Sequence, residues 1–174
     1  MLASQKIIDA FNEQIGNEFG AANQYIAIAS YFADENLEEL SQFFMRQGEE
    51  ERAHGMKFVK FILDVGGKLE IPAIEAPRSD FSSAEEAVQA SLTWEQEVTQ
   101  MIYGLVDLCR GESNHIALRF LDWFVTEQLE EVTLMDNLLG VVRRAGENNL
   151  LYVEDYLARH GVEGAESATA NGAG

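Results

Sequence analysis

Residues 49–54 read Glu-Glu-Glu-Arg-Ala-His, and residues 126–131 read Thr-Glu-Gln-Leu-Glu-Glu. The second stretch lies 77 positions after the first, because 128 − 51 and 131 − 54 both equal 77, and 95 − 18 gives the same offset. The repeat therefore matches Glu18, Glu51 and His54 with Glu95, Gln128 and Glu131. Side chains that can bind metals occupy the repeated positions. The repeat predicts two copies of one helical hairpin that close around a shared inner site for two metal ions.

Helical periodicity runs through most of the chain. Apolar residues recur every three or four positions over 4–35, where they include Ile26, and over 38–65 and 113–145. Another helix begins after Ser82 or Ser83 and ends near Gly111, and a shorter one covers 149–159. The chain has only two prolines and lacks the alternating Val, Ile and Thr runs that strands show. The fold is predicted to be all-α.

The connection between the second and third helices decides the predicted topology. Pro72 and Pro77 exclude a continuous helix over 67–82. A helix of about 28 residues is roughly 42 Å long, whereas about 16 extended residues reach roughly 53 Å. The connection can therefore cross the whole bundle. We expect a four-helix bundle with a long crossover between helices two and three and a short fifth helix at the C-terminal end.

Composition limits the classes of partner. The 174 residues, 47% of them hydrophobic, suffice for a single domain, predicted over 1–160, with residues 161–174 as a disordered Gly- and Ala-rich tail. The formal charge of −18 disfavours nucleic acid and anionic membranes as partners and attracts cations. No apolar run reaches membrane length, and the first 30 residues lack the order of a secretion signal. A cytoplasmic protein is expected.

The repeated polar residues occupy core positions at one height. Glu18 shares its helix face with Phe11, Ile15 and Ala22. Glu18 and His54 both lie 18 positions from a turn expected near residue 36, because 36 − 18 and 54 − 36 both equal 18. Residues 95 and 131 stand in the same relation to a turn expected near residue 113. All four helices can therefore contribute to one central cluster.

Four buried carboxylates need a compensating charge, because each would otherwise cost several kcal/mol or remain protonated. No lysine or arginine occupies the repeated positions, and Arg52 is rotated by about 100° from Glu51 on its helix. Two divalent cations balance four carboxylates. Carboxylates together with one imidazole suit iron or manganese.

Each motif also has an ordinary structural explanation. A single Glu-x-x-His pair on a helix is common by chance, and an acidic run such as residues 49–51 usually faces solvent. The repeat, the matched heights and the apolar surroundings favour the metal site. By contrast, His115 and His160 are expected at the surface, Cys109 as a small apolar residue, and Tyr25 and Trp123 as core or boundary aromatics.

With these motifs the chain resembles the ferritins, and in particular the non-haem bacterial type. The stretches Asn17-Glu18-Phe19, Gln24-Tyr25, 49–54, Glu95 and 123–131 occur in the order and spacing of that family. The resemblance covers nearly the whole chain apart from the tail. A bacterioferritin would repeat Glu-x-x-His and carry a haem-ligating methionine after its first glutamate, where this chain has Arg52. Haem is therefore not expected.

The resemblance implies a role for each polar residue. One iron would be held by Glu18, Glu51 and His54, while Glu51 bridges to a second iron held by Glu95 and Glu131, with Gln128 as a weak partner. A third iron position beside the pair maps onto Glu50, Glu127 and Glu130. Tyr25 would lie near the pair, and Trp123 is a further candidate electron donor.

The activity that the resemblance implies is oxidation of Fe(II) by O2 or peroxide, with ferric mineral stored inside a hollow 24-subunit homo-oligomer. Two other classes stay open. A dimetal oxidase or oxygenase could use the same carboxylates on an organic substrate, and it would need a substrate cavity beside the metals. The chain could also be a non-catalytic shell or scaffold subunit whose polar core no longer has a function. The presence of a complete set of candidate ligands argues against this alternative.

Overall fold

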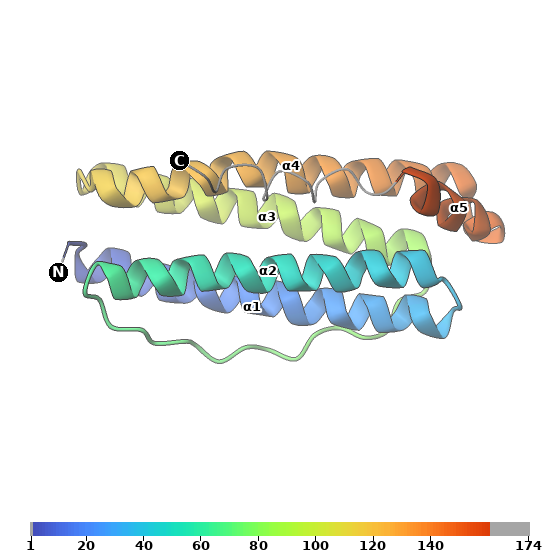
Figure 1. Cartoon of the computed structure of the whole chain (residues 1–174), viewed down its shortest axis with the longest axis horizontal. Coiled ribbons are helices and arrows are strands. Elements are labelled where there is room, and N and C mark those ends of the chain that lie inside the picture. Colours follow the sequence, from blue (N-terminus) through green and yellow to red (C-terminus); the bar gives the residue numbers. More distant parts are fainter. Residues whose placement is uncertain (1, 161–174) are drawn as a thin grey trace, which may run out of the picture.

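The computed structural model describes residues 2–160, and all the regular structure in this range is helical. The elements are α1 (Gln5–Asp34), α2 (Glu38–Asp64), α3 (Ala84–Gly111), α4 (His115–Ala145), the short 3-10 helix η1 (Glu147–Asn149) and α5 (Leu150–His160). The predicted all-α four-helix bundle with a fifth short helix is confirmed (Figure 1). The prediction of a disordered tail over 161–174 lies outside the described residues. None of the described helices is long and apolar enough to span a membrane.

The long helices begin where side chains cap them. Ser4 accepts a hydrogen bond from the backbone N–H of Ile7 at 3.2 Å, which opens α1. Ser83 accepts one from Glu86 at 3.0 Å, which opens α3 and decides between the two serines that the sequence allowed. Asn114 opens α4 in the same way. Each cap satisfies a donor that the first helical turn leaves unpaired.

The 77-residue repeat extends to the turns of the two hairpins. α1 packs mainly against α2, and α3 against α4. Asn36 turns the first hairpin with a φ of 59°, and Ser113 turns the second with a φ of 53°. These two positions are again 77 apart, since 113 − 36 equals 77, and both adopt the left-handed conformation that ends a helix. The two hairpins therefore share their turn geometry as well as the spacing of their polar residues.

The crossover between α2 and α3 runs along the bundle beside α1 and returns the chain to the opposite end (Figure 1). Two amide side chains of α1 tie it down. Asn12 bonds to the backbone of Lys68 and Glu70, and Gln24 bonds to both backbone groups of Arg78. α2 and α3 therefore run in the same direction, and the predicted long crossover is confirmed.

Two apolar clusters fill the bundle at its two ends. One includes Phe11, Phe58 and Phe124 near the start of α1, and the other includes Phe32 and Phe44 near α5. The prediction that Ile26 belongs to the core face is wrong, because its side chain is 48% exposed. The core face of α1 there follows Tyr25, Ile28, Ala29 and Phe32 instead, which turns Ile26 outward.

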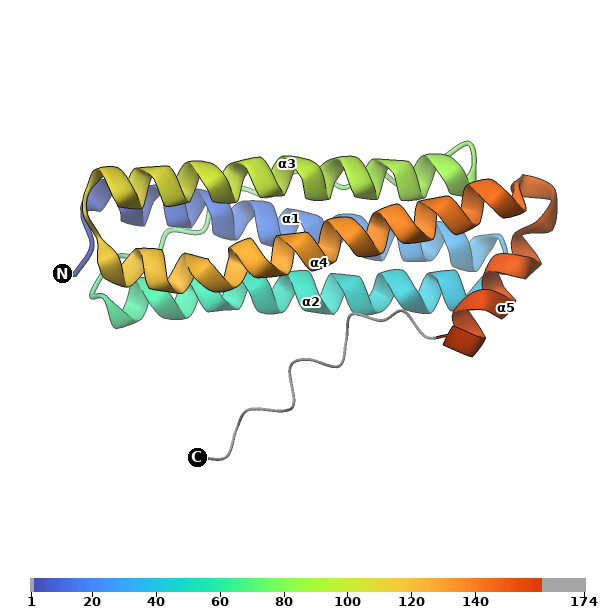
Figure 2. The same ribbon diagram turned by 90° about the horizontal axis from the view of Figure 1, so that it is seen from above.

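The short helix α5 crosses the end of the bundle near the start of α2 (Figure 2). Leu37, at the N-terminus of α2, gives no side-chain cap. Glu154 of α5 supplies one, because its carboxylate accepts from the backbone N–H groups of Glu39 at 2.8 Å and Leu40 at 2.9 Å. Glu147 serves the start of α3 in the same way. Two carboxylates at helix N-termini thus fix the fifth helix to the bundle.

We expect Glu154→Ala to lower the free energy of unfolding by about 1 kcal/mol, because α2 loses its only cap and its favourable terminal charge. Urea unfolding followed by circular dichroism measures this loss. The matched control is Asp155→Ala, which removes an exposed carboxylate that pairs only with Arg159 on the same helix. Equal stability of the two variants would contradict the capping role.

Candidate metal centre

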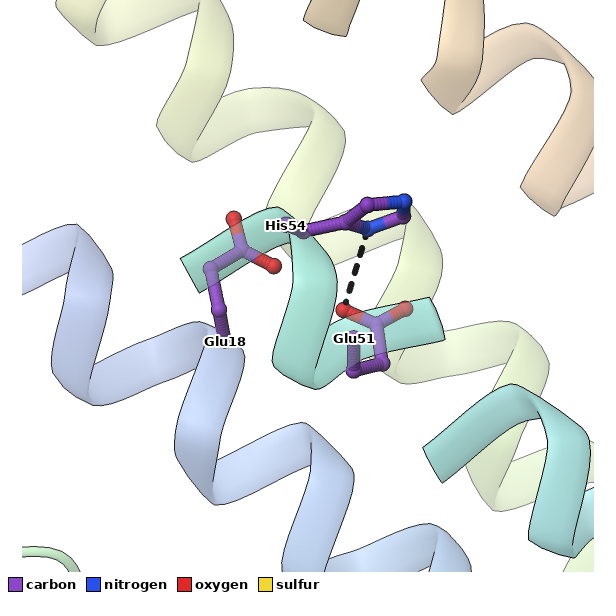
Figure 3. A group of neighbouring side chains, drawn as sticks. All are labelled: Glu18, Glu51 and His54. Atoms are coloured by element: carbon purple, nitrogen blue, oxygen red, sulfur yellow. Dashed lines mark ion pairs between the residues drawn. The ribbon is translucent and has the colours of Figure 1, made fainter. Parts of the chain in front are cut away.

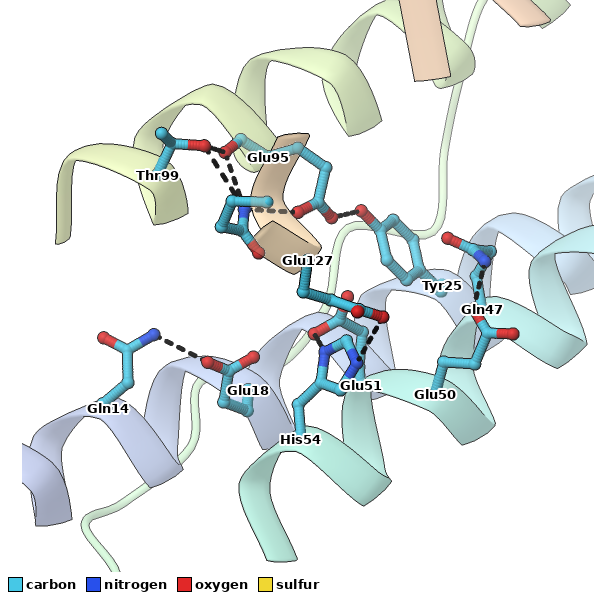
Figure 4. Close-up of polar contacts among 11 residues, drawn as sticks. Gln14, Glu18, Tyr25, Gln47, Glu50, Glu51, His54, Glu95, Thr99 and Glu127 are labelled. Atoms are coloured by element: carbon cyan, nitrogen blue, oxygen red, sulfur yellow. Dashed lines mark hydrogen bonds and ion pairs between the residues drawn. The ribbon is translucent and has the colours of Figure 1, made fainter. Parts of the chain in front are cut away.

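Six polar side chains lie between the two apolar clusters, at one level of the bundle. Figure 4 labels four of them, Glu18, Glu51, His54 and Glu95. α1 contributes one, α2 two, α3 one and α4 two: Glu18, Glu51, His54, Glu95, Gln128 and Glu131. Their exposed fractions lie between 1% and 4%. On each long helix, the residues of one apolar cluster come before the polar residues and those of the other cluster come after them. This arrangement agrees with the prediction that the polar residues of all four helices lie at one level.

Three of these residues form a compact group of possible metal ligands. One ligand atom each from Glu18, Glu51 and His54 lies within 4.8 Å of the others (Figure 3). His54 Nδ1 is 3.5 Å from Glu51 Oε2. α1 and α2 therefore supply a carboxylate, a second carboxylate and an imidazole that converge on one point.

The other side of His54 faces α4. His54 Nε2 is 3.6 Å from Glu127 Oε1, and His54, Glu127 and Glu131 form a second group that meets the same 4.8 Å limit. The Oε2 atom of Glu131 is buried and has no hydrogen-bond partner. A buried carboxylate oxygen without a donor is costly unless a cation binds it.

Glu95, on α3, is held by donors on two other helices, α1 and α4. The Tyr25 hydroxyl donates to its Oε1 atom, and the amide nitrogen of Gln128 lies 3.3 Å from its Oε2 atom. That amide also lies 3.2 Å from the backbone oxygen of Glu95 and 3.3 Å from the Thr99 hydroxyl. Since the nitrogen of Gln128 faces Glu95, only its carbonyl oxygen remains for a metal.

The residues predicted for a third metal position are only partly brought together. Glu50 and Glu127 are half-buried, and Glu127 lies against His54. Glu130 is exposed and belongs to neither group of possible ligands. Its neighbour Glu131, three residues after Gln128, faces the core instead.

Two supporting amides were missed by the sequence analysis. Gln14 is 2% exposed and donates to Glu18 at 2.8 Å, and Gln47 is 4% exposed and donates to Glu50 at 2.6 Å. Each lies about one helical turn before the carboxylate that it serves. Their signal in the sequence is the one used for the ligands, a polar residue inside an apolar stripe.

The aromatic and cysteine residues lie largely as expected. Tyr25 is fully buried, and Trp123 is 38% exposed with its ring 5.3 Å from that of His54. His115 and His160 are exposed. Cys109 is buried in the apolar cluster around Phe11.

Burial dominates the electrostatics of the centre. It raises the pKa of Glu51 well above its usual range, and the charges of Glu95 and Glu18 raise it further. Burial also raises the pKa of Glu131, with Glu95 adding to the effect, and raises the pKa of Glu95 to about 7 although Tyr25 donates to it. Glu51, Glu95 and Glu131 therefore hold protons to a higher pH than exposed carboxylates do unless a cation replaces them.

His54 is a basic side chain inside the centre. Burial lowers the pKa of His54, but the hydrogen bond to Glu127 and the charge of Glu18 outweigh this and leave it raised. Within residues 2–160, none of the ion pairs made by lysine or arginine involves the four buried glutamates. Divalent cations fit this set of oxygen and imidazole donors.

Comparison with known proteins agrees with this geometry. The family model for a ferritin-like domain matches residues 8–145. The chain is 37% identical over 153 residues to a bacterial non-heme ferritin of Staphylococcus aureus, covering 87% of this chain and 92% of that protein. It is 42% identical over 147 residues to ferritin BfrB of Mycobacterium tuberculosis, covering 84% of this chain and 81% of that protein. An open pore ferritin from Archaeoglobus fulgidus superimposes with a TM-score of 0.87 at 32% identity, covering 90% of this chain and 98% of that one.

We expect the metal-free protein to be less stable at about pH 8 than at about pH 5.5, by about 2 kcal/mol for Glu95 alone. The folded state keeps a proton on Glu95 up to about pH 7, whereas the unfolded state loses it from about pH 4.5, so stability falls as pH rises through this window. Urea unfolding in the presence of a chelator measures the difference. Glu95→Gln should flatten the profile, and an unchanged profile in this variant would contradict the assignment.

Proposed function

Because the chain belongs to the ferritin family, we propose that its buried centre binds pairs of Fe(II) ions, oxidises them and passes the product to a ferric store. The observation that carries the proposal is the set of four buried carboxylates at one level, none of which pairs with a lysine or arginine within residues 2–160. Two divalent ions would balance these four charges. The relatives named above are ferritins, which supports iron as the metal.

The geometry supports a division of the centre into two iron positions. The first would be held by Glu18, Glu51 and His54, which already converge within 4.8 Å. The second would be held by Glu95 and Glu131, with Glu51 as the bridge between the two. Gln128 would be a weak ligand of the second position, because only its neutral carbonyl oxygen is left for a metal.

Two adjacent Fe(II) ions allow a two-electron reaction. Each ion loses one electron, and O2 gains two electrons and two protons to leave as hydrogen peroxide, so no free superoxide forms. Peroxide as oxidant would accept the same two electrons and give water. The carboxylates favour Fe(III) once it has formed, because hard oxygen ligands prefer the more highly charged ion. Weak ligation by Gln128 would let the oxidised iron leave.

The roles of the aromatic residues follow from their contacts. Tyr25 would orient Glu95 and could supply an electron to the pair, since its hydroxyl donates directly to that ligand. Trp123 lies against His54 and is a second candidate donor of electrons. Lys57 stands 4.2 Å above the indole ring. This positive charge disfavours a tryptophan radical cation, so oxidised Trp123 would have to lose its proton.

A third iron position beside the pair is proposed at Glu50 and Glu127. Both carboxylates are half-buried, so they lie between the closed centre and solvent. Glu130 would join them only after its side chain turns from its exposed position. Iron that leaves the pair would pass this position on its way out.

Storage requires a closed container, which one bundle cannot provide. We propose a homo-oligomeric shell of 24 subunits, as the ferritin relatives suggest. Several large apolar side chains of α1, α2 and α5 are exposed on the single subunit, including Ile26, Met45, Met56 and Leu151. Contacts between subunits would remove this apolar surface from water.

An oxidase acting on an organic substrate has less support. A cavity of about 620 Å³ lies between α1, α3 and the crossover, and its walls include Gly20, Tyr25, Ile74 and Trp94. None of the proposed iron ligands lines it. A substrate in this cavity would meet the ring of Tyr25 before it could reach a metal. A vestigial scaffold is also disfavoured, because every carboxylate of the ligand set is present and buried.

We expect Glu51→Ala to slow the initial oxidation of Fe(II) by at least about tenfold, since both irons lose the shared ligand. The ferric absorbance after aerobic Fe(II) addition measures the rate, and a sizing column measures the iron that coelutes with protein. Glu49→Ala is the matched control, because Glu49 is an exposed glutamate on the same helix. Wild-type iron that stops near two per chain on a small oligomer would instead favour an organic substrate.

We expect Tyr25→Phe to weaken binding of the second metal by about tenfold, because Glu95 loses a donor that orients it. Binding at Glu18, Glu51 and His54 should change little. An anaerobic calorimetric titration with Zn²⁺ separates the two steps. Tyr31→Phe, on the same helix but remote from the ligands, is the control. A first step that weakens as much as the second would reject this assignment.

A further inference from the structure

The side-chain amide of Gln47 forms a hydrogen bond through its nitrogen but not through its oxygen within the described residues. Its side chain lies on α2, one turn before Glu51, and is 4% exposed. Its nitrogen Nε2 donates to Glu50 Oε2 at 2.6 Å. Its carbonyl oxygen Oε1 is buried and has no hydrogen-bond partner among residues 2–160. Figure 4 shows the nitrogen turned to Glu50 and the oxygen on the opposite side of the amide.

The corresponding amide on α1 differs in one respect. Gln14 Nε2 donates to Glu18 at 2.8 Å, and its carbonyl oxygen accepts from Asn17 Nδ2 at 3.3 Å. Both ends of Gln14 are therefore satisfied by the protein. Because a carboxylate only accepts hydrogen bonds when ionised, the nitrogen of Gln47 must face Glu50, and flipping the amide would not give its oxygen a donor.

The hydrogen bond from Gln47 helps to determine the orientation of the Glu50 carboxylate. This carboxylate is half-buried; the charges of His54 and Arg46 attract it, and the like charge of Glu127 repels it. The hydrogen bond from Gln47 opposes that repulsion. A neutral amide can do this without a positive charge that would compete with a bound metal.

We propose that Gln47 is the positioning residue of the third iron position, where its nitrogen holds Glu50 toward Glu127 and its free oxygen accepts a hydrogen bond from water that arrives with the metal. This inference rests on the proposed function. Gln47 acts through Glu50 and does not itself need to bind iron. A buried carbonyl without a protein donor is satisfied when a water molecule donates to it, and this oxygen is available to such a water.

The test compares Gln47→Met with wild type in crystals soaked in graded Zn²⁺, with anomalous scattering used to measure each site separately. Met fills a similar volume but neither donates nor accepts a strong hydrogen bond. We expect zinc between Glu50 and Glu127 to need at least about tenfold more metal for half occupancy in the variant. The ions at Glu18, Glu51, His54, Glu95 and Glu131 should fill as in wild type and report that the fold is intact.

Gln42→Met is the matched control, because Gln42 is an exposed glutamine of α2 that donates to Glu38 at 3.2 Å. Unchanged zinc occupancy beside Glu50 in Gln47→Met, or an equal loss in Gln42→Met, would overturn the proposal. Metal-free crystals of wild type and Gln47→Met give a second test, the position of the Glu50 side chain, which does not depend on iron chemistry. There we expect the Glu50 side chain to turn to solvent in Gln47→Met, and a Glu50 that keeps its wild-type position would also overturn it. Absence of zinc at the pair in wild type would count against the proposed function instead.

Discussion

Four carboxylates buried at one level of a helical bundle are the constraint to which the rest of the structure responds. Such groups are stable in the core only when protonated or paired with cations, and no lysine or arginine of the described chain reaches them. The apolar core is accordingly divided into two clusters, one on each side of this level. Apolar packing alone does not account for this interruption of the core, because buried carboxylates without partners lower the stability of the fold.

The groups that support the carboxylates are neutral. Gln14 donates to Glu18, Gln47 to Glu50, and Tyr25 and Gln128 to Glu95. Amides and a hydroxyl orient the oxygens without supplying a full positive charge. A lysine or arginine in their place would pair with the carboxylates permanently and exclude a metal. The choice of neutral donors is therefore what keeps the centre both ordered and open to cations.

The crossover and the short fifth helix form an outer frame that holds the four long helices in register around the buried carboxylates. Asn12 and Gln24 hold the crossover against α1, so that α2 and α3 run in parallel and all four helices place polar side chains at one height. Glu147 and Glu154 fix the short fifth helix to the starts of α3 and α2. The cavity beneath the crossover is lined in part by Tyr25, and its walls do not include Glu18, Glu51, His54, Glu95, Gln128 or Glu131. The frame thus keeps the metal level closed from this side.

The sequence by itself determined the helices, the crossover and the level of the buried polar residues, because periodicity, caps and a fixed 77-residue offset are local or one-dimensional properties. It also located the turns at Asn36 and Ser113, although not their shared left-handed geometry. Only the tertiary structure decided the supporting contacts. The pairing of Tyr25 with Glu95, the placement of Glu130 outside the cluster and the free oxygen of Gln47 depend on side-chain directions between helices. Those directions arise from packing at distances that no sequence pattern encodes.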